Sequence, residues 1–221
     1  MTVRLVVAPH LDDEVLGVGG ALARWAQEGQ PAQVLVVTRG TAPLYSDAEE
    51  ERCRREGLAA HELLGVARTR FLDLPAAELD TLAQRVVNQA LLGVLQDASP
   101  EELYLPFPGD LHRDHQLVFQ AGLVAARPNR PGYPKAIYAY ETLSETNWNA
   151  PGLTPGFQPD HFIDITAHLA TKLAAMAQFR SQLRAAPHER SLESLRALAL
   201  LRGARVALGA AEAFVTIRTV T

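Results

Sequence analysis

The sequence of 221 residues has only one cysteine, Cys53. A single thiol cannot form an intramolecular disulfide, and it cannot build the cysteine-rich type of zinc site. The chain therefore needs no oxidising environment for its fold, and we expect a cytoplasmic protein.

Excess positive charge and long apolar runs are lacking as well. Lysine and arginine number 21 against 25 acids, which gives a net charge of -4. This balance lacks the basic footprint that binding to a phosphate backbone requires, so we expect no nucleic-acid partner.

The first apolar run, residues 5–8, ends at Pro9. Because no run reaches the roughly 18 to 20 apolar residues of a membrane span, we expect neither a spanning helix nor a signal peptide.

Apolar residues are nevertheless plentiful enough for one hydrophobic core. They make up 48% of the chain, and 221 residues lie within the size range of single domains. We therefore expect one domain over residues 1–221. The composition leaves the oligomeric state open, a homo-oligomer included.

Short β-branched runs alternate with amphipathic stretches along the chain, the pattern of an α/β protein. The expected strands cover residues 3–8, 33–38, 70–74, 102–105, 136–140 and 213–218. Helices are expected between the first two strands and over residues 47–65, 78–96, 116–126, 166–184 and 191–208. This order predicts an open, mostly parallel sheet with helices on both faces. The proline-rich stretch 127–160 is expected to form an elaborated loop region near the functional site.

Two polar clusters follow expected strands. The sequence Pro-His-Leu-Asp-Asp-Glu at residues 9–14 follows the first strand, and a second cluster at residues 109–115 follows the fourth. The carboxyl ends of parallel strands meet at one edge of the sheet, which is where open α/β sheets bind ligands. The two distant segments are therefore predicted to converge.

The converging residues include a ligand set that suits one Zn²⁺ ion. A catalytic zinc has three protein ligands of the imidazole or carboxylate kind and one position open for water. His10, Asp13 and His115 supply such a set. Asp12 is then placed to take a proton from metal-bound water, and His112 to stabilise a developing oxyanion.

Each cluster alone has an ordinary structural alternative. An acidic run after a strand is often an N-cap with favourable charge at the start of a helix. A single loop histidine is usually a surface residue. The coincidence of both clusters at strand ends favours the metal site.

The same residues resemble the PIG-L or LmbE-like zinc-dependent N-acetylglucosaminyl deacetylases. The resemblance comprises residues 9–14, Gly17-Val18-Gly19-Gly20, His112-Arg113-Asp114-His115, Tyr140-Glu141-Thr142, Thr146-Asn147-Trp148, Asp164-Ile165 and Ala211-Glu212-Ala213-Phe214. It implies a Rossmann-like fold with zinc on His10, Asp13 and His115. It further implies Asp12 as the general base and His112 as the residue that stabilises the tetrahedral intermediate.

The resemblance also implies the reaction, which is hydrolysis of a linear amide. The implied substrate is an N-acetylglucosamine-type sugar or glycoconjugate, from which the enzyme would release acetate. Glu141, Asn147 and Trp148 are predicted to contact this small-molecule substrate, through sugar hydroxyls and ring stacking.

The chain departs from the family pattern at three positions. Leu11 replaces a proline that is common in the first motif. Arg39 stands where members often carry an acid, and Cys53 stands near a frequent arginine. Arg52, Arg54 and Arg55 are candidate substitutes for that arginine. The last two departures lie toward the expected substrate and bear on the identity of the sugar.

Two other functions compete with deacetylation. A metal-dependent phosphoesterase would also use aspartate and histidine ligands, but many such sites hold two metals and need more carboxylates than these motifs supply. A non-catalytic sugar-binding module of the same fold is the other alternative. The glycines at residues 17–20 lack the spacing of a phosphate-binding loop and are expected to serve close packing of a helix on the sheet.

Overall fold

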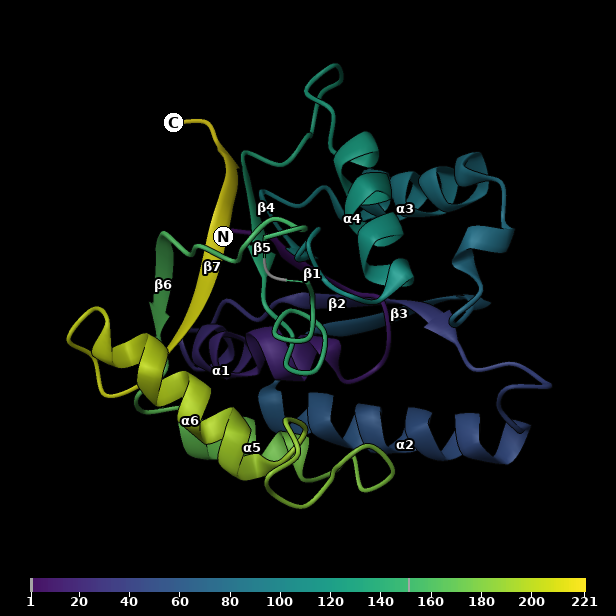
Figure 1. The fold of residues 1–221 in the computed structure, drawn as a ribbon. Coiled ribbons are helices and arrows are strands. Elements are labelled where there is room, and N and C mark those ends of the chain that lie inside the picture. The colour runs from purple at the N-terminus through teal and green to yellow at the C-terminus, as the bar shows by residue number, and fades with distance from the viewer. Residues whose placement is uncertain (1, 151) are drawn as a thin grey trace.

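The computed structural model describes residues 2–150 and 152–221. Within these ranges the strands form a seven-stranded sheet in the order β3-β2-β1-β4-β5-β7-β6 (Figure 1). The strands are β1 (Arg4–Ala8), β2 (Gln33–Arg39), β3 (Arg68–Pro75), β4 (Glu102–Pro106), β5 (Ala136–Tyr140), β6 (His161–Asp164) and β7 (Ala211–Thr219). β7 pairs antiparallel with β5 and β6, and the other four strand pairs in this sheet are parallel, so the prediction of a mostly parallel sheet is confirmed.

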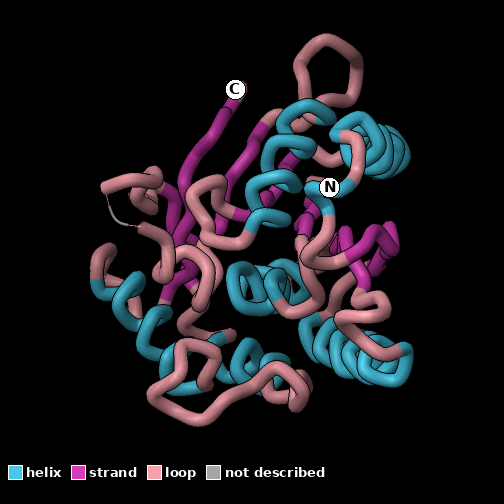
Figure 2. Tube along the Cα trace, turned by 45° about the vertical axis from the view of Figure 1, so that its right-hand side comes forward, coloured by secondary structure: helices cyan, strands magenta, loops and turns pink. Residues whose placement is uncertain are grey.

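Helices cover both faces of the sheet, as predicted (Figures 1 and 2). One face carries α1 (Asp13–Gln27), α2 (Asp47–Leu64), α5 (Leu169–Met176) and α6 (Leu192–Ala204); the other carries α3 (Gln84–Ala98) and α4 (Arg113–Ala125). Successive side chains of β1 point to opposite faces, so Val6 enters one core while Leu5 and Val7 enter the other. Within the described ranges, no helix combines the length and the apolar character needed to cross a membrane.

The predicted helix over residues 166–184 is wrong in its extent, because α5 ends at Met176. Phe179 turns into the core and is fully buried, and the side chain of Ser181 donates a 2.6 Å hydrogen bond to Glu56 of α2. These tertiary contacts take the chain off the helical path. We call residues 177–191 the α5–α6 loop.

The predicted helix over residues 78–96 begins later than expected. A 3-10 turn, η1 (Leu79–Thr81), precedes α3. The backbone N–H groups of Ala77 and Leu79 donate to the carboxylate of Asp114, at 2.7 and 3.3 Å. Since these groups are engaged by Asp114, the segment forms a turn beside the polar clusters instead of the first turn of a helix.

The stretch 127–160 contains β5 as predicted, and a later part of it lies against the second polar cluster. The backbone N–H of Leu111 donates to the carbonyl of Glu145 at 3.1 Å. The four-residue edge strand β6 was not predicted, because a run this short has no clear alternation of apolar and polar side chains.

The glycines of α1 allow the helix to lie close to the sheet. A Cβ on Gly20 would come within 2.7 Å of the side chain of Ile165. A Cβ on Gly17 would lie 2.9 Å from Cγ of Tyr140 and 3.0 Å from the carbonyl oxygen of Glu141. The packing interpretation of these glycines is confirmed.

Replacing Gly17 with alanine is therefore expected to destabilise the protein by about 1–3 kcal/mol, the usual cost of overpacking a core. Tyr140 cannot easily move, since it is fully buried and its hydroxyl donates a 2.8 Å hydrogen bond to the carbonyl of Val7. Urea unfolding measures the change. The control is Gly93→Ala in α3, where nothing lies within 4 Å of the added Cβ. That variant is expected to gain about 0.5–1 kcal/mol, and equal effects in both variants would contradict the packing argument.

Candidate active site

The turn between β1 and α1 places the first polar cluster at the carboxyl edge of the sheet. A carboxylate oxygen of Asp13 accepts a 2.8 Å hydrogen bond from the backbone N–H of His10, which closes the turn. Asp12 has a φ of 137°, a conformation that residues with a Cβ rarely adopt. Its backbone N–H donates to Glu14 at 3.2 Å. Backbone strain of this kind is typical of functional sites, and here it occurs at the predicted general base.

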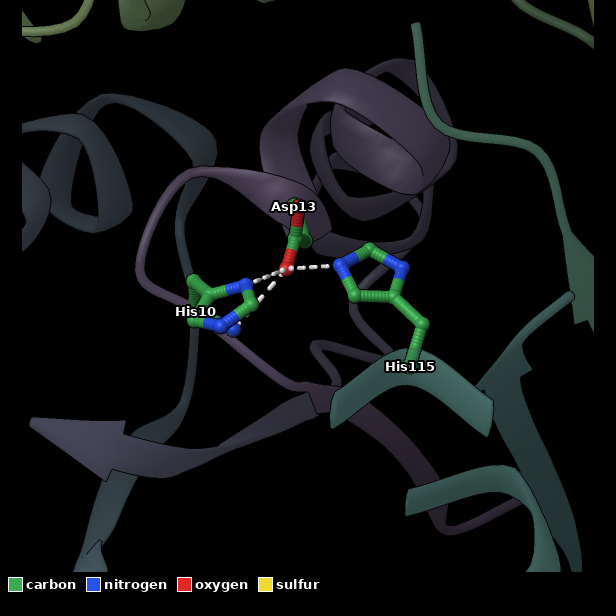
Figure 3. Close-up of side chains that lie close together, drawn as sticks. All are labelled: His10, Asp13 and His115. Carbon is green, nitrogen blue, oxygen red and sulfur yellow. Dashed lines mark hydrogen bonds and ion pairs between the residues drawn. The ribbon is translucent and has the colours of Figure 1, made fainter. Parts of the chain in front are cut away.

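The second cluster reaches the same place because β4 lies beside β1 and runs parallel to it. His112 is the N-cap of α4, where its Nδ1 accepts a 3.1 Å hydrogen bond from the backbone N–H of Asp114. His115, in the first turn of α4, then faces the β1 turn (Figure 3). One oxygen of Asp13 lies 3.3 Å from Nδ1 of His10 and 3.2 Å from Nε2 of His115.

Two further carboxylates orient the imidazole rings. Nδ1 of His115 lies 2.8 Å from Asp110, and Nε2 of His10 lies 3.1 Å from Asp114. Asp110 is itself fixed by a 2.6 Å hydrogen bond from the hydroxyl of Thr146. Each ring thus uses one nitrogen for a carboxylate and turns the other toward Asp13, the arrangement that metal-binding histidines usually show.

The electrostatics of the cluster favour a cation. Burial lowers the pKa of His10, but hydrogen bonds with Asp114 and Asp13 outweigh burial and raise this pKa to about 9. Burial also lowers the pKa of His115, but the charges and hydrogen bonds of Asp13 and Asp110 outweigh burial and raise this pKa to about 10. Burial alone would raise the pKa of Asp13, yet the two histidines hold it well below its usual value. The carboxylates therefore create a site of negative potential that binds positive charge.

Unpaired buried atoms point to a shared partner. Asp13 Oδ1 and His115 Nε2 are buried without a hydrogen-bond partner among the described residues, although His115 Nε2 lies 3.2 Å from Asp13 Oδ2. One ligand atom from each of His10, Asp13 and His115 lies within 4.8 Å of the other two. The three residues form a candidate metal-binding triad whose donor types suit zinc.

A second grouping, His10 with His112 and Asp114, also has atoms within 4.8 Å of one another. Its carboxylate is already engaged, because Asp114 accepts two backbone hydrogen bonds and lies 3.1 Å from Nε2 of His10, and Nδ1 of His112 also accepts a backbone hydrogen bond. The triad with Asp13 is therefore the better metal site.

A cavity of about 440 Å³ opens beside the triad. His10, Asp12 and His112 line it together with residues of β2, α2 and the α5–α6 loop. Asp13 and His115 are fully buried. Their burial leaves His10 as the triad residue that borders the cavity, with the predicted general base and the predicted oxyanion stabiliser beside it.

Arg190, in the α5–α6 loop, is a residue of the site that sequence reasoning missed. Its Nη1 lies 3.3 Å from Asp12, its Nε donates to Ser144 at 2.8 Å, and its Nη2 lies 3.5 Å from Glu145. No motif marks this arginine, and the predicted helix ended before it. Only the tertiary fold shows that it reaches Asp12.

The predicted substrate-contact residues lie elsewhere. The described residues that line the cavity do not include Glu141, Asn147 or Trp148. Glu141 is buried and accepts two hydrogen bonds from Arg202, at 2.7 and 2.6 Å. Asn147 is exposed, and Trp148 is half exposed with its ring 5.7 Å from that of His188. Their contact with substrate stays a prediction.

The positions that depart from the family pattern do border the cavity. Leu11, Arg39 and Cys53 all line it, and so does Arg52, one of the candidate substitutes for the arginine. Burial raises the pKa of Cys53 to about 12, so the thiol is protonated at neutral pH when no metal is bound to it.

The other two candidate substitutes for the missing arginine are engaged elsewhere. The guanidinium of Arg54 lies 4.0 Å above the ring of Phe71 and pairs with Asp73. Arg55 is exposed on α2 and lies 4.0 Å from Glu51. Of the three candidates, Arg52 is therefore the one that faces the cavity.

Fold and site together define a Rossmann-like α/β protein with a candidate metal centre at the carboxyl edge of its sheet. The family described as PIG-L, GlcNAc-PI de-N-acetylase, matches residues 5–126. The matched segment contains both polar clusters and more than half of the chain. The chain belongs to the PIG-L family.

Two relatives carry the similarity beyond the matched segment. The uncharacterized deacetylase YaiS of Escherichia coli (strain K12) is 31% identical over 186 residues, which cover 80% of this chain and 90% of YaiS. The diacetylchitobiose deacetylase of Thermococcus kodakarensis is 26% identical over 187 residues, covering 80% of this chain and 69% of that enzyme.

Solved structures share the whole fold. The conserved protein TT1542 from Thermus thermophilus has a TM-score of 0.81 and 26% identity, covering 100% of this chain and 97% of that one. GalB, the 4-carboxy-2-hydroxymuconate hydratase from Pseudomonas putida, has a TM-score of 0.78 and 23% identity, covering 100% and 98%. Because a hydratase has this fold, the fold alone does not fix the reaction.

The carboxylate that orients His115 gives a test of the triad. Asp110→Asn is expected to weaken binding of Zn²⁺ by about 10- to 100-fold, because the ring loses its charged hydrogen-bond partner. Isothermal titration of the metal-free protein measures the affinity. Asp97→Asn is the control, since Asp97 lies on the surface with its side chain 63% exposed. Unchanged affinity in Asp110→Asn would contradict the proposed orientation of His115.

Proposed function

We propose that this protein is a zinc-dependent deacetylase that hydrolyses the acetamide of an N-acetylglucosamine-type sugar or glycoconjugate. One observation carries the proposal: a triad with metal-ligand donors lies beside a carboxylate, Asp12, that is not part of the triad and lines the same cavity. The relative from Thermococcus kodakarensis is named for deacetylation of an N-acetylated sugar, which supports the substrate class.

His10, Asp13 and His115 would hold the zinc ion, with His10 using Nδ1 and His115 using Nε2. The opposite nitrogens of these rings are occupied by Asp114 and Asp110. When bound, zinc lowers the pKa of water and polarises the substrate carbonyl.

Asp12 is the proposed general base. Burial raises the pKa of its carboxyl, while the charge of Arg190 opposes this rise. A raised pKa suits a group that must take a proton and give it back near neutral pH. The carboxylate accepts a proton from the attacking water as the new C–O bond forms. It then gives that proton to the amide nitrogen as the C–N bond breaks, so the products are acetate and the free amine.

His112 is the proposed stabiliser of the oxyanion, in its neutral form. Burial and the neighbouring His10 lower the pKa of His112 to about 4. Because Nδ1 accepts the backbone hydrogen bond of Asp114, the ring proton lies on Nε2. Nε2 is then free to donate to the oxygen on which negative charge develops.

The two competing functions make different demands on the site. A two-metal phosphoesterase needs a second set of free ligands, whereas Asp110 and Asp114 are engaged with His115 and His10. A purely sugar-binding module has no use for a strained, buried carboxylate beside the triad. Both arguments favour a single-metal hydrolase.

Asp12→Asn is expected to retain one zinc per chain and to lose about 10²- to 10⁴-fold in kcat, the usual contribution of a general base. Release of acetate from N-acetylglucosamine glycosides measures kcat, and plasma mass spectrometry measures the metal. Asp80→Asn, at an exposed position, is the matched control and should behave as the unmodified protein. A fully active Asp12→Asn variant would refute the assigned base.

Removal of the metal tests the remaining part of the proposal. Chelation is expected to abolish acetate release, and one equivalent of Zn²⁺ per chain should restore it. Two bound metal ions per chain without acetate release would instead favour the phosphoesterase alternative. Zinc-loaded protein that binds N-acetylated sugars without releasing acetate would favour the binding module.

A further inference from the structure

A buried chain of three side chains lies behind the proposed general base, and the proposed mechanism does not use it. Glu14, in the first turn of α1, is fully buried, and His61, in the last turn of α2, is 3% exposed. Nε2 of His61 lies 2.9 Å from Oε1 of Glu14, and Nδ1 of His61 lies 2.8 Å from the hydroxyl oxygen of Thr69 in β3. These contacts connect α1, α2 and β3.

The chain of contacts ends on the backbone of Asp12. Oε2 of Glu14 accepts a 3.2 Å hydrogen bond from the backbone N–H of Asp12. The carbonyl of Asp12 accepts from the N–H groups of Val15 and Leu16, at 3.0 and 2.9 Å, so α1 itself begins in the ordinary way. Among the described residues, Glu14 is thus the side chain that holds the backbone of the proposed base.

Asp12 does not behave as an ordinary N-cap residue. An N-cap usually has an extended backbone, and its side chain accepts a hydrogen bond from the start of its helix. Ser46 and Ser191 follow this pattern at α2 and α6, with φ of -81° and -95°. Asp12 has a φ of 137°, and its carboxylate makes no capping bond but lines the cavity, 3.3 Å from Nη1 of Arg190. The proposed base therefore combines backbone strain with the loss of a cap.

A strained residue keeps its conformation only where its surroundings hold it. The N–H of Asp12 belongs to the peptide plane before Asp12, whereas Glu14 belongs to the helix after it. A hydrogen bond between them spans the rotation φ of Asp12 and locks it. Glu14 is held in turn, because a carboxylate so deeply buried needs partners and His61 supplies one from another helix. A carboxylate that only complemented the dipole of α1 would need neither bond.

We propose that Glu14 is a positioning residue, which locks Asp12 in the conformation that points its carboxylate into the cavity, and that His61 fixes Glu14. This inference rests on the proposed deacetylation, since Asp12 is the proposed base. The described residues that line the cavity do not include Glu14 or His61, so both act on the reaction only through Asp12.

Two substitutions of Glu14 test the hydrogen bond in the zinc-loaded protein. Glu14→Ala is expected to lower kcat by about 10- to 100-fold with little change in KM, since a displacement of about 1 Å has effects of this order. Glu14→Gln should retain most of kcat, because its amide oxygen still accepts from Asp12 while its amide nitrogen donates to the other tautomer of His61. Acetate release from N-acetylglucosamine glycosides measures both. Equal losses in the two variants would assign the effect to charge and overturn the proposal.

A double-mutant cycle separates positioning from a general structural role. In the Asp12→Asn background, Glu14→Ala should lower the residual kcat by less than about twofold, because the residue through which Glu14 acts is already disabled. In the unmodified background, His61→Ala should lower kcat by about three- to tenfold, the factor that one lost hydrogen bond gives. A loss from Glu14→Ala that is equally large in both backgrounds would overturn the proposal.

Glu102→Ala is the control for lost stability. Glu102 lies at the amino end of β4, where it accepts hydrogen bonds from Arg4 and Tyr104 at 2.9 and 3.0 Å. This variant should unfold at a lower urea concentration, as Glu14→Ala does, but should keep its kcat. All variants should still bind one zinc per chain. A similar loss of kcat in Glu102→Ala would assign the effect of Glu14→Ala to destabilisation and overturn the positioning role.

Crystal structures provide a readout that needs neither zinc nor turnover. In Glu14→Ala, Asp12 is expected to leave the region of positive φ and to turn its carboxylate toward the backbone N–H groups of α1, as an ordinary N-cap does. Where Glu14→Ala does not fold, the structure of His61→Ala decides the same question.

The conformation of Asp12 also separates this inference from the proposed function. An Asp12 that keeps φ near 137° and its contact with Arg190 overturns the positioning role, even where acetate release is found. A relaxed Asp12, in a protein whose unmodified form releases no acetate from any sugar, would overturn the deacetylase proposal and leave the positioning role standing.

Discussion

The arrangement of the rest of the site depends on one constraint, which is the buried negative charge at the junction of β1 and β4. Asp13, Asp110 and Asp114 are each at most 1% exposed, and carboxylates so far from water need positive partners. His10 and His115 supply them in part, through hydrogen bonds to Asp114 and Asp110 and close charge contacts at 3.3 and 3.2 Å with Asp13. Asp13 Oδ1 and His115 Nε2 still lack a hydrogen-bond partner among the described residues, and ligand atoms of His10, Asp13 and His115 lie within 4.8 Å of one another. The cluster is therefore best understood as a place for a divalent cation.

The fold meets this constraint through contributions from distant parts of the chain. The turn after β3 and the start of η1 give two backbone N–H groups to Asp114, and Thr146 gives its hydroxyl to Asp110. The α5–α6 loop adds Arg190, which balances the charge of Asp12. The two hydrogen bonds to Asp114 explain why the segment around η1 departs from a regular helix, since its backbone N–H groups are used at the site.

The sequence predicted the sheet, its helical layers and the convergence of the two polar clusters, because all three follow from local patterns and from the parallel topology. It did not predict Arg190, whose position depends on a loop that Phe179 and Ser181 pull away from α5. Nor did the sequence show which of Arg52, Arg54 and Arg55 lines the cavity. These neighbouring residues of one helix differ only in the direction in which their side chains point. Local sequence patterns do not show which residues the tertiary structure brings into contact.

The central claim is that two imidazoles and one carboxylate hold a single zinc ion in a site shared with Asp12. X-ray absorption spectroscopy of the zinc-loaded protein tests this claim most directly. The account predicts a shell of nitrogen and oxygen atoms at about 2.0–2.1 Å with the outer-shell scattering of two imidazole rings. Sulfur in the shell at about 2.3 Å, or a second metal at about 3.5–4 Å, would contradict the account.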